Sequence, residues 1–107
     1  MKYRVLVLAE AEDDIVDIYN YIALADGIER ADHILSELQA SCEKLNGLPR
    51  RGHVPPELET LGIRDFREIH YKPYRIIYEV VGRRVYVYAV LDGRRSLQEL
   101  LERRLLR

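Results

Sequence analysis

Apolar residues recur at helical spacing through the first half of the chain, after a short strand-like start. The sequence KYRVLVL at residues 2–8 is rich in Val and Leu and predicts a strand. The next apolar residues follow the i, i+3, i+4, i+7 spacing of one helix face: Ile15, Ile18, Tyr19 and Ile22. The acidic residues at 10–14 suit the start of this helix, and Gly27 suits its end.

A second helix is predicted from about Glu29 to Leu45. Its apolar stripe is continuous: Ala31, Ile34, Leu35, Leu38, Cys42 and Leu45. Because the connection between the two helices is short, we expect an antiparallel helical hairpin with Cys42 buried in the core. From Pro49 to Leu61, glycine and the Pro55-Pro56 pair predict a long loop without regular structure.

The next part of the chain alternates in the manner of strands, which we predict at 63–71, 74–81 and 85–91. Short turns at Lys72-Pro73 and Gly82-Arg83 predict an antiparallel meander. Strict alternation would place Tyr74, Ile76, Tyr78 and Val80 on one face of the middle strand. It would also place four residues of the last strand on one face: Val85, Val87, Ala89 and Leu91. Both faces of this sheet are therefore partly apolar, and the hairpin can cover only one of them.

A short helix is predicted at 95–107, where Ser96 and Glu99 fit a capping box. Its apolar face is Leu97, Leu100, Leu101 and Leu105. The predicted order is β-α-α-β-β-β-α, an α+β fold with a helical hairpin on a small, twisted, mainly antiparallel sheet. The length of 107 residues fits a single domain. The first strand can join either edge of the meander.

The composition describes an ordered protein, with 48% hydrophobic and 33% charged residues. One cysteine, no signal peptide and no long apolar run predict a cytoplasmic protein without a membrane partner. The net charge of −1 conceals an asymmetry: residues 1–49 sum to −6 and residues 50–107 to +5. This split indicates either a charged partner on the basic side or two halves that attract each other.

Seven arginines between residues 61 and 95 are interleaved with tyrosines and branched aliphatic residues. They are Arg64, Arg67, Arg75, Arg83, Arg84, Arg94 and Arg95. Arginines in this setting can grip RNA and stabilise a phosphorane-like transition state, which also requires a general acid and base. They can equally anchor a protein interface, where arginine and tyrosine are both enriched.

The sequence contains no recognisable metal or cofactor motif. His33, His53 and His70 fall in a helix, a loop and a strand without ligand spacing, and His33 lies off the apolar stripe. There is no glycine-rich phosphate loop and no nucleophile elbow. The acidic residues at 10–14 are explained by a helix start. We therefore predict no metal site and no cofactor.

Several segments, in this order and spacing, resemble the toxins of the RelE/ParE superfamily, and most closely its ParE-like branch. They are the Tyr21-Ile22 pair, LGIRDFREI at 61–69, PYRIIYEV at 73–80, VYVYAVLDGRR at 85–95 and LLERRLL at 100–106. The resemblance covers nearly the whole chain. It implies a type II toxin–antitoxin system in which a small ParD-like or RelB-like antitoxin wraps the toxin with an extended segment. The toxin then meets operator DNA only through the antitoxin. A ParE-like toxin implies poisoning of DNA gyrase, and a RelE-like toxin implies cleavage of messenger RNA in the ribosome.

The residues that RelE-like nucleases use for catalysis are poorly matched in this sequence. Arg75 matches the strand arginine that RelE-like nucleases use on phosphate, but ParE-like chains share it. The lysine cluster expected of RelE is missing. Asp92 stands where such nucleases often place His or Tyr, and pairing with Arg94 and Arg95 would make it a poor proton donor. His70, by alternation, points away from Arg67.

The leading hypothesis is a non-enzymatic toxin that binds a protein target, with gyrase as that target. The expected functional surface comprises Arg67, Arg75, Arg94, Arg95 and the tail helix with Leu101 and Leu105. Secondary candidates are Arg64, Tyr74, Tyr78, Tyr86 and Tyr88. The alternative is a ribosome-dependent endonuclease using Arg67, Arg75 and His70, and a third possibility is an inactive relative that still binds antitoxin. We also expect the isolated chain to expose apolar surface and to gain stability from its antitoxin.

Overall fold

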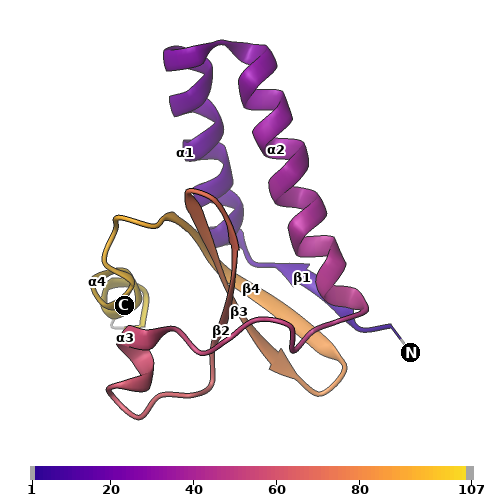
Figure 1. Cartoon of the computed structure of the whole chain (residues 1–107), viewed down its shortest axis with the longest axis vertical. Coiled ribbons are helices and arrows are strands. Elements are labelled where there is room, and N and C mark those ends of the chain that lie inside the picture. Colours follow the sequence, from indigo (N-terminus) through magenta and orange to yellow (C-terminus); the bar gives the residue numbers. More distant parts are fainter. Residues whose placement is uncertain (1, 106–107) are drawn as a thin grey trace.

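The computed structural model describes residues 2–105, with the backbone alone for Leu105, and confirms the predicted α+β order (Figure 1). The first half holds β1 (Arg4–Val7), α1 (Ala9–Asp26), α2 (Ile28–Glu43) and a 3₁₀ turn at Lys44–Asn46. The second half holds α3 (Pro56–Glu59), β2 (Arg67–Tyr71), β3 (Tyr74–Val81), β4 (Arg84–Asp92) and α4 (Leu97–Leu105). No helix among the described residues is long and apolar enough to cross a bilayer.

The two long helices form the expected hairpin, which rises from the sheet in Figure 1. Gly27 alone joins them, with a φ of 98° that disfavours any residue with a side chain. The buried stripes of both helices pack on β3 and β4 to form the main core. Its fully buried residues on the sheet are Ile76, Tyr78, Val85, Val87 and Val90. Cys42 is buried as predicted, and burial raises the pKa of its thiol to about 11.

The sheet has the strand order β1-β4-β3-β2, which places the first strand at the β4 edge. There β1 runs parallel to β4, while β2–β3 and β3–β4 are antiparallel as predicted. The predicted start of β2 at Ile63 is wrong, because the chain there is still leaving α3. It turns through Gly62, which has a φ of 77°, and the strand begins only at Arg67.

The strict alternation predicted for the last strand is also wrong. Ile77 pairs with Ala89, but Tyr78 pairs with Val87, so Tyr88 is an extra residue in β4. Such a β-bulge reverses the faces that follow it. Val85 and Val87 therefore face the hairpin, whereas Ala89 and Leu91 face the opposite side.

That opposite side is covered by a second core built from α3 and α4. Its members are Leu58, Ile77, Ala89, Leu91, Leu97, Leu100 and Leu101. The start of α4 is capped as predicted, because Ser96 Oγ accepts the Glu99 N–H at 3.2 Å. The expectation of a loop without regular structure from Pro49 to Leu61 is wrong for Pro56–Glu59. Proline fits the first helical turn, and Leu58 is buried in the second core.

Candidate functional site

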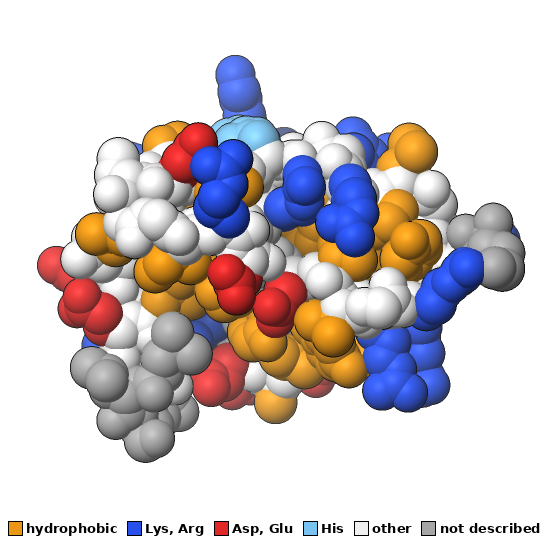
Figure 2. Space-filling view, turned by 90° about the horizontal axis from the view of Figure 1, so that it is seen from below, with side chains coloured by type: hydrophobic (Ala, Val, Ile, Leu, Met, Phe, Trp, Pro, Cys, Tyr) orange, Lys and Arg blue, Asp and Glu red, His pale blue; other side chains and the backbone are white. Residues whose placement is uncertain are grey.

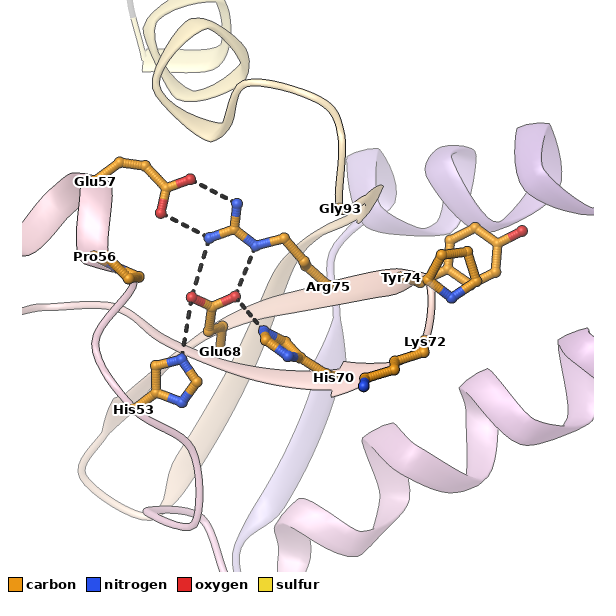
Figure 3. Close-up of a pocket in the computed structure, with 10 residues that line it drawn as sticks. His53, Pro56, Glu57, Glu68, His70, Lys72, Tyr74, Arg75 and Gly93 are labelled. Carbon is orange, nitrogen blue, oxygen red and sulfur yellow. Dashed lines mark hydrogen bonds and ion pairs between the residues drawn. The ribbon is translucent and has the colours of Figure 1, made fainter.

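Arg75 lies at the centre of a compact charged cluster on the α3 side of the sheet (Figure 3). Its guanidinium donates to both carboxylate oxygens of Glu57, at 2.6 and 2.8 Å. It also donates to both oxygens of Glu68, at 2.7 and 3.0 Å. The register places Arg75 opposite His70 and Glu68 opposite Ile77, so Glu68, His70 and Arg75 share one face. The α3 helix then brings Glu57 onto that face.

The cluster keeps its carboxylates ionised even though one of them is buried. Only 1% of the Glu68 side chain is exposed, against 12% for Arg75. Burial acts to raise the pKa of Glu68, but hydrogen bonds from Arg75 and His70 outweigh it and hold that pKa below its usual range. The hydrogen bond from Arg75 likewise lowers the pKa of Glu57. The Arg75 pKa is raised, chiefly by Glu57. This guanidinium is therefore permanently charged, and at neutral pH it faces two ionised carboxylates.

The lowered carboxylate pKa values predict that acid destabilises the fold. Each carboxylate has a lower pKa folded than unfolded, where a glutamate has a value of about 4.3. Its contribution to stability is therefore complete above that value and is lost as pH falls through the folded pKa. Urea unfolding measured between pH 7 and pH 3 should show this loss, and Glu57→Gln should reduce it. Glu59→Gln is the matched control, because it removes an exposed carboxylate that lies near Arg64 rather than Arg75, and it should not reproduce the effect of Glu57→Gln.

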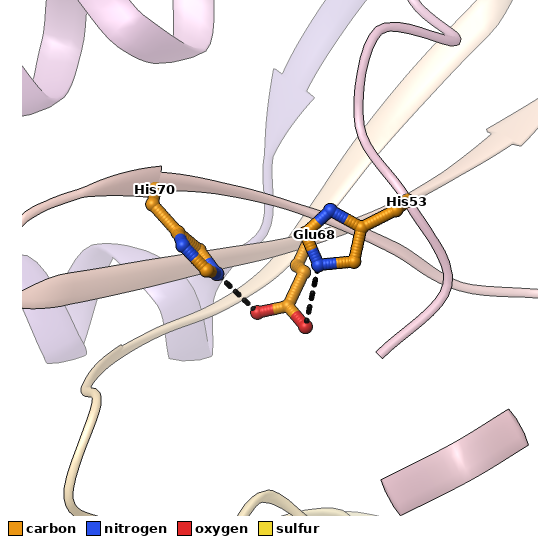
Figure 4. Close-up of side chains that lie close together, drawn as sticks. All are labelled: His53, Glu68 and His70. Atoms are coloured by element: carbon orange, nitrogen blue, oxygen red, sulfur yellow. Dashed lines mark hydrogen bonds and ion pairs between the residues drawn. The ribbon is translucent and has the colours of Figure 1, made fainter. Parts of the chain in front are cut away.

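Two histidines complete the cluster, which corrects the prediction that the histidines are scattered (Figure 4). His70 Nε2 lies 2.8 Å from Glu68 Oε1, and His53 Nε2 lies 3.3 Å from Glu68 Oε2. The loop that carries His53 runs along the edge of β2, where the backbones of His53 and Glu68 form two hydrogen bonds. Only the alternation of Glu68 and His70 was visible in the sequence. His33 is exposed on α2, as expected.

A second feature is a cleft of about 430 Å³ between α1 and the end of β4. It brings together three predicted residues, Tyr74, Arg94 and Arg95, with Tyr21 of α1. Asp92 also lines this α1–β4 cleft and accepts hydrogen bonds from the Arg94 backbone and side chain, at 2.9 and 3.2 Å. The expected ion pair with Arg94 is confirmed, and it holds the pKa of Asp92 below its usual range, whereas Arg95 contributes to that shift through its charge.

Two of the predicted contact residues are buried, and we correct those assignments. Tyr78 is fully buried, and its hydroxyl accepts the Gly52 N–H at 3.0 Å. Leu101 packs in the second core. Tyr78 and Leu101 are therefore core residues, one in each core, and do not belong to a binding surface. The side chain of Leu105, a further candidate, lies outside the described residues.

The remaining candidates occupy separate parts of the molecule. Arg67 is half-buried and donates to the backbone carbonyls of Arg50 and Gly52, at 3.3 and 2.8 Å, which fastens the loop. Tyr88 stacks edge-on against Phe66 and is hydrogen-bonded to Glu79. Of the three residues in the nuclease hypothesis, His70 and Arg75 both contact Glu68. Arg67 does not join them, because it contacts the loop instead. Of the last two predicted contact residues, Tyr86 is half-buried and Arg64 is exposed.

Arg104 of α4 is a structural residue that sequence reasoning missed. Its guanidinium lies 3.1 Å from Glu10 and 2.6 Å from Asp14, and it donates to the Tyr88 carbonyl at 2.7 Å. Asp14 in turn accepts the Val90 N–H at 3.0 Å. The acidic start of α1 therefore also holds α4 against the body of the protein.

The charge asymmetry of the chain is only partly resolved by internal pairing. Arg104 bridges the basic and acidic halves, whereas Arg64, Arg75 and Arg94 pair with carboxylates of their own half. Figure 2 shows Lys and Arg side chains on the face away from the hairpin tip, interleaved with hydrophobic side chains and some carboxylates. Arg84 and Arg95 are among the exposed arginines that a partner can reach.

An open sheet with a helical hairpin on one face and a short C-terminal helix on the other defines the RelE/ParE class of small toxin folds. The structure is similar to the chromosomal ParDE system from Pseudomonas aeruginosa, with a TM-score of 0.71 and 15% identity over 84% of this chain and 95% of that one. It is also similar to the RelBE2 toxin–antitoxin complex from Mycobacterium tuberculosis, with a TM-score of 0.62 and 16% identity over 86% and 99%.

The sequence narrows this class to one family. Residues 5–97 match the family of the ParE toxin of type II toxin–antitoxin system, parDE. A relative, Toxin ParE3 of Caulobacter vibrioides, is 26% identical over 94 residues, covering 88% of this chain and 90% of that protein. The chain therefore belongs to the ParE toxin family of type II toxin–antitoxin systems.

Proposed function

We propose that this toxin arrests growth in the cytoplasm by poisoning DNA gyrase, and that a cognate antitoxin neutralises it by binding its surface. The proposal rests on membership of the ParE family, on the ParE-like segments of the sequence and on the state of Arg75. The last of these carries most weight, because it bears on which of the two superfamily activities this chain can perform.

Arg75 is poorly placed for phosphate chemistry. Four hydrogen bonds tie its guanidinium to Glu57 and Glu68, so a phosphate would have to displace a bidentate carboxylate. Two negative charges beside one guanidinium also repel an anionic RNA backbone. Asp92, ionised and paired with Arg94, cannot donate a proton at neutral pH. These contacts favour a protein-binding toxin over a nuclease.

The α1–β4 cleft is the surface we assign to protein partners. Arg94 is 91% exposed and Tyr21 is 74% exposed, and arginine with tyrosine is the usual composition of binding hot spots. Leu24, one turn beyond Tyr21 on α1, projects almost completely into solvent. The isolated chain thus exposes apolar side chains, as predicted. An antitoxin segment laid along the cleft and continuing over α1 would cover Tyr21 and Leu24 and block the target.

The test is inhibition of purified gyrase by the purified chain. We expect loss of supercoiling and accumulation of cleaved DNA, with each effect reversed by antitoxin. Tyr21→Ala and Arg95→Ala should each weaken inhibition roughly 30-fold, which corresponds to a hot spot of about 2 kcal/mol. Arg84→Ala is the matched control, because this exposed arginine lies at the opposite end of β4 from the cleft.

The endonuclease alternative retains one favourable observation, the proximity of His70 and Arg75 around Glu68. It predicts messenger RNA cleavage within codons during translation, and its loss in His70→Ala. Such cleavage with unaffected gyrase would overturn the proposal. Normal growth during expression, with retained antitoxin binding, would instead identify an inactive relative.

A further inference from the structure

We propose that His53, Glu68 and His70 form a binding site for one divalent transition-metal ion, with Zn²⁺ as the ion that fits these ligands best. Two imidazoles and one carboxylate are a ligand set that zinc accepts in proteins. This assignment is independent of the proposed action on gyrase, because it concerns residues outside the α1–β4 cleft.

The three side chains already lie close enough together for one ion to bridge them. Zinc bonds to nitrogen and oxygen are about 2.0–2.2 Å long, so tetrahedral ligand atoms lie about 3.3 Å apart. His53 Nε2 lies 3.3 Å from Glu68 Oε2, and His70 Nε2 lies 2.8 Å from Glu68 Oε1. One ligand atom of each residue lies within 4.8 Å of the others. Both imidazoles aim Nε2 at the carboxylate (Figure 4), so each residue already directs a ligand atom toward the others.

The backbone fixes this arrangement. His53 is the cross-strand neighbour of Glu68, joined to it by backbone hydrogen bonds of 2.7 and 3.2 Å. His70 follows Glu68 by two residues on β2, so alternation places both on the same face. Strand pairing therefore fixes the backbone positions of the three ligands, and little backbone entropy remains to be lost when an ion binds.

Arg75 and Glu57 lie behind the ligands, where they orient Glu68 and set the net charge of the site. Arg75 holds the Glu68 carboxylate in place, as residues next to metal ligands commonly do. Glu57 neutralises Arg75 through two hydrogen bonds, which leaves the Glu68 charge available to a cation. Glu68 Oε2 has the longer contact with Arg75, 3.0 Å against 2.7 Å for Oε1, and is the oxygen facing His53. Its second lone pair can therefore bind the ion without breaking the contact with Arg75.

The site is open on two sides, which gives an ion access and leaves room for a fourth ligand. Clefts of about 490 and 400 Å³ flank it, and all three ligands line both. Water, or a side chain of a bound partner, can fill the remaining position. The immediate effect of an ion would be to fasten the loop at His53 to β2, and so to raise the stability of the folded chain.

The three histidines of the chain provide a matched experiment. The protein is prepared without a polyhistidine tag, freed of metal with a chelator, and titrated with Zn²⁺ by calorimetry and with Co²⁺ by visible absorption. We expect one ion per chain in the micromolar range or tighter, tetrahedral Co²⁺ bands and a higher melting temperature with Zn²⁺. His53→Gln and His70→Gln should each lose all three effects, whereas His33→Gln, on exposed α2, should keep them.

Two results would overturn the proposal. One is the absence of micromolar Zn²⁺ binding to the unaltered chain. The other is binding that survives both His53→Gln and His70→Gln, or that disappears equally in His33→Gln, since either pattern means adventitious surface binding. Because the His53 side chain is exposed, we expect its replacement to keep the fold, and urea unfolding in the presence of chelator checks this for each variant. Glu68→Gln is unsuitable because it would also disturb Arg75.

Discussion

Replacing Arg75 with alanine is expected to lower the free energy of unfolding by about 3–5 kcal/mol, the usual cost of breaking a buried ion pair by removing one partner. The variant would leave Glu68, with 1% of its side chain exposed, as a buried carboxylate without its guanidinium. Glu57 would lose its partner as well. Urea denaturation at pH 7 measures the loss directly.

Two comparisons isolate the cause of this loss. Arg64→Ala removes an exposed arginine 3.6 Å from Glu59 and should cost no more than about 0.5 kcal/mol. Combining Arg75→Met with Glu57→Gln and Glu68→Gln should recover part of the stability, because no unpaired buried charge then remains. If Arg75→Ala instead retains nearly full stability but loses toxicity, the arginine acts on a target and the paired arrangement opens in solution.

The order of elements, the helical hairpin and the two-sided sheet were predictable because each follows from local periodicity. The bulge at Tyr88 was not, since it is an irregularity in strand pairing that the alternating sequence of β4 conceals. Its consequence is large, because it assigns Ala89 and Leu91 to the second core. The α3 helix was missed for a related reason: four residues that begin at the second proline of a Pro-Pro pair carry too little periodicity to be recognised.

The candidate sites were predictable in their parts but not in their assembly. Tyr74, Arg94 and Arg95 were identified one by one, and folding adds Tyr21 from α1 to form the cleft. The histidine cluster depends on how a loop lies along β2, which no spacing in the sequence encodes. The abundance of arginine was visible, but which arginines are buried was not. Partners distant in the sequence determine which arginines are buried: Glu57 pairs with Arg75, and Asp14 pairs with Arg104.

Replacing Arg104 with alanine is expected to cost about 3 kcal/mol of stability and to loosen α4 from the body of the protein. Arg104 is 13% exposed, and its partner Asp14 is 11% exposed, so their contact is largely desolvated. The variant also removes a hydrogen bond to the Tyr88 carbonyl and the contact with Glu10. Because Arg104 ties the last helix to the first, its loss should release α4 before the hairpin unfolds.

Hydrogen exchange measures whether α4 opens before the helical hairpin unfolds. In Arg104→Ala, amides of α4 should exchange much faster than in the unaltered chain, whereas amides of α2 should exchange at rates set by global unfolding. Arg103→Ala is the matched control, since its side chain is exposed on the same helix. Equal effects in the two variants would mean that general helix propensity, rather than the contacts with Glu10 and Asp14, holds α4. Uniform acceleration across the molecule would mean that α4 and the hairpin unfold as one unit, so that the second core is part of the same cooperative structure as the first.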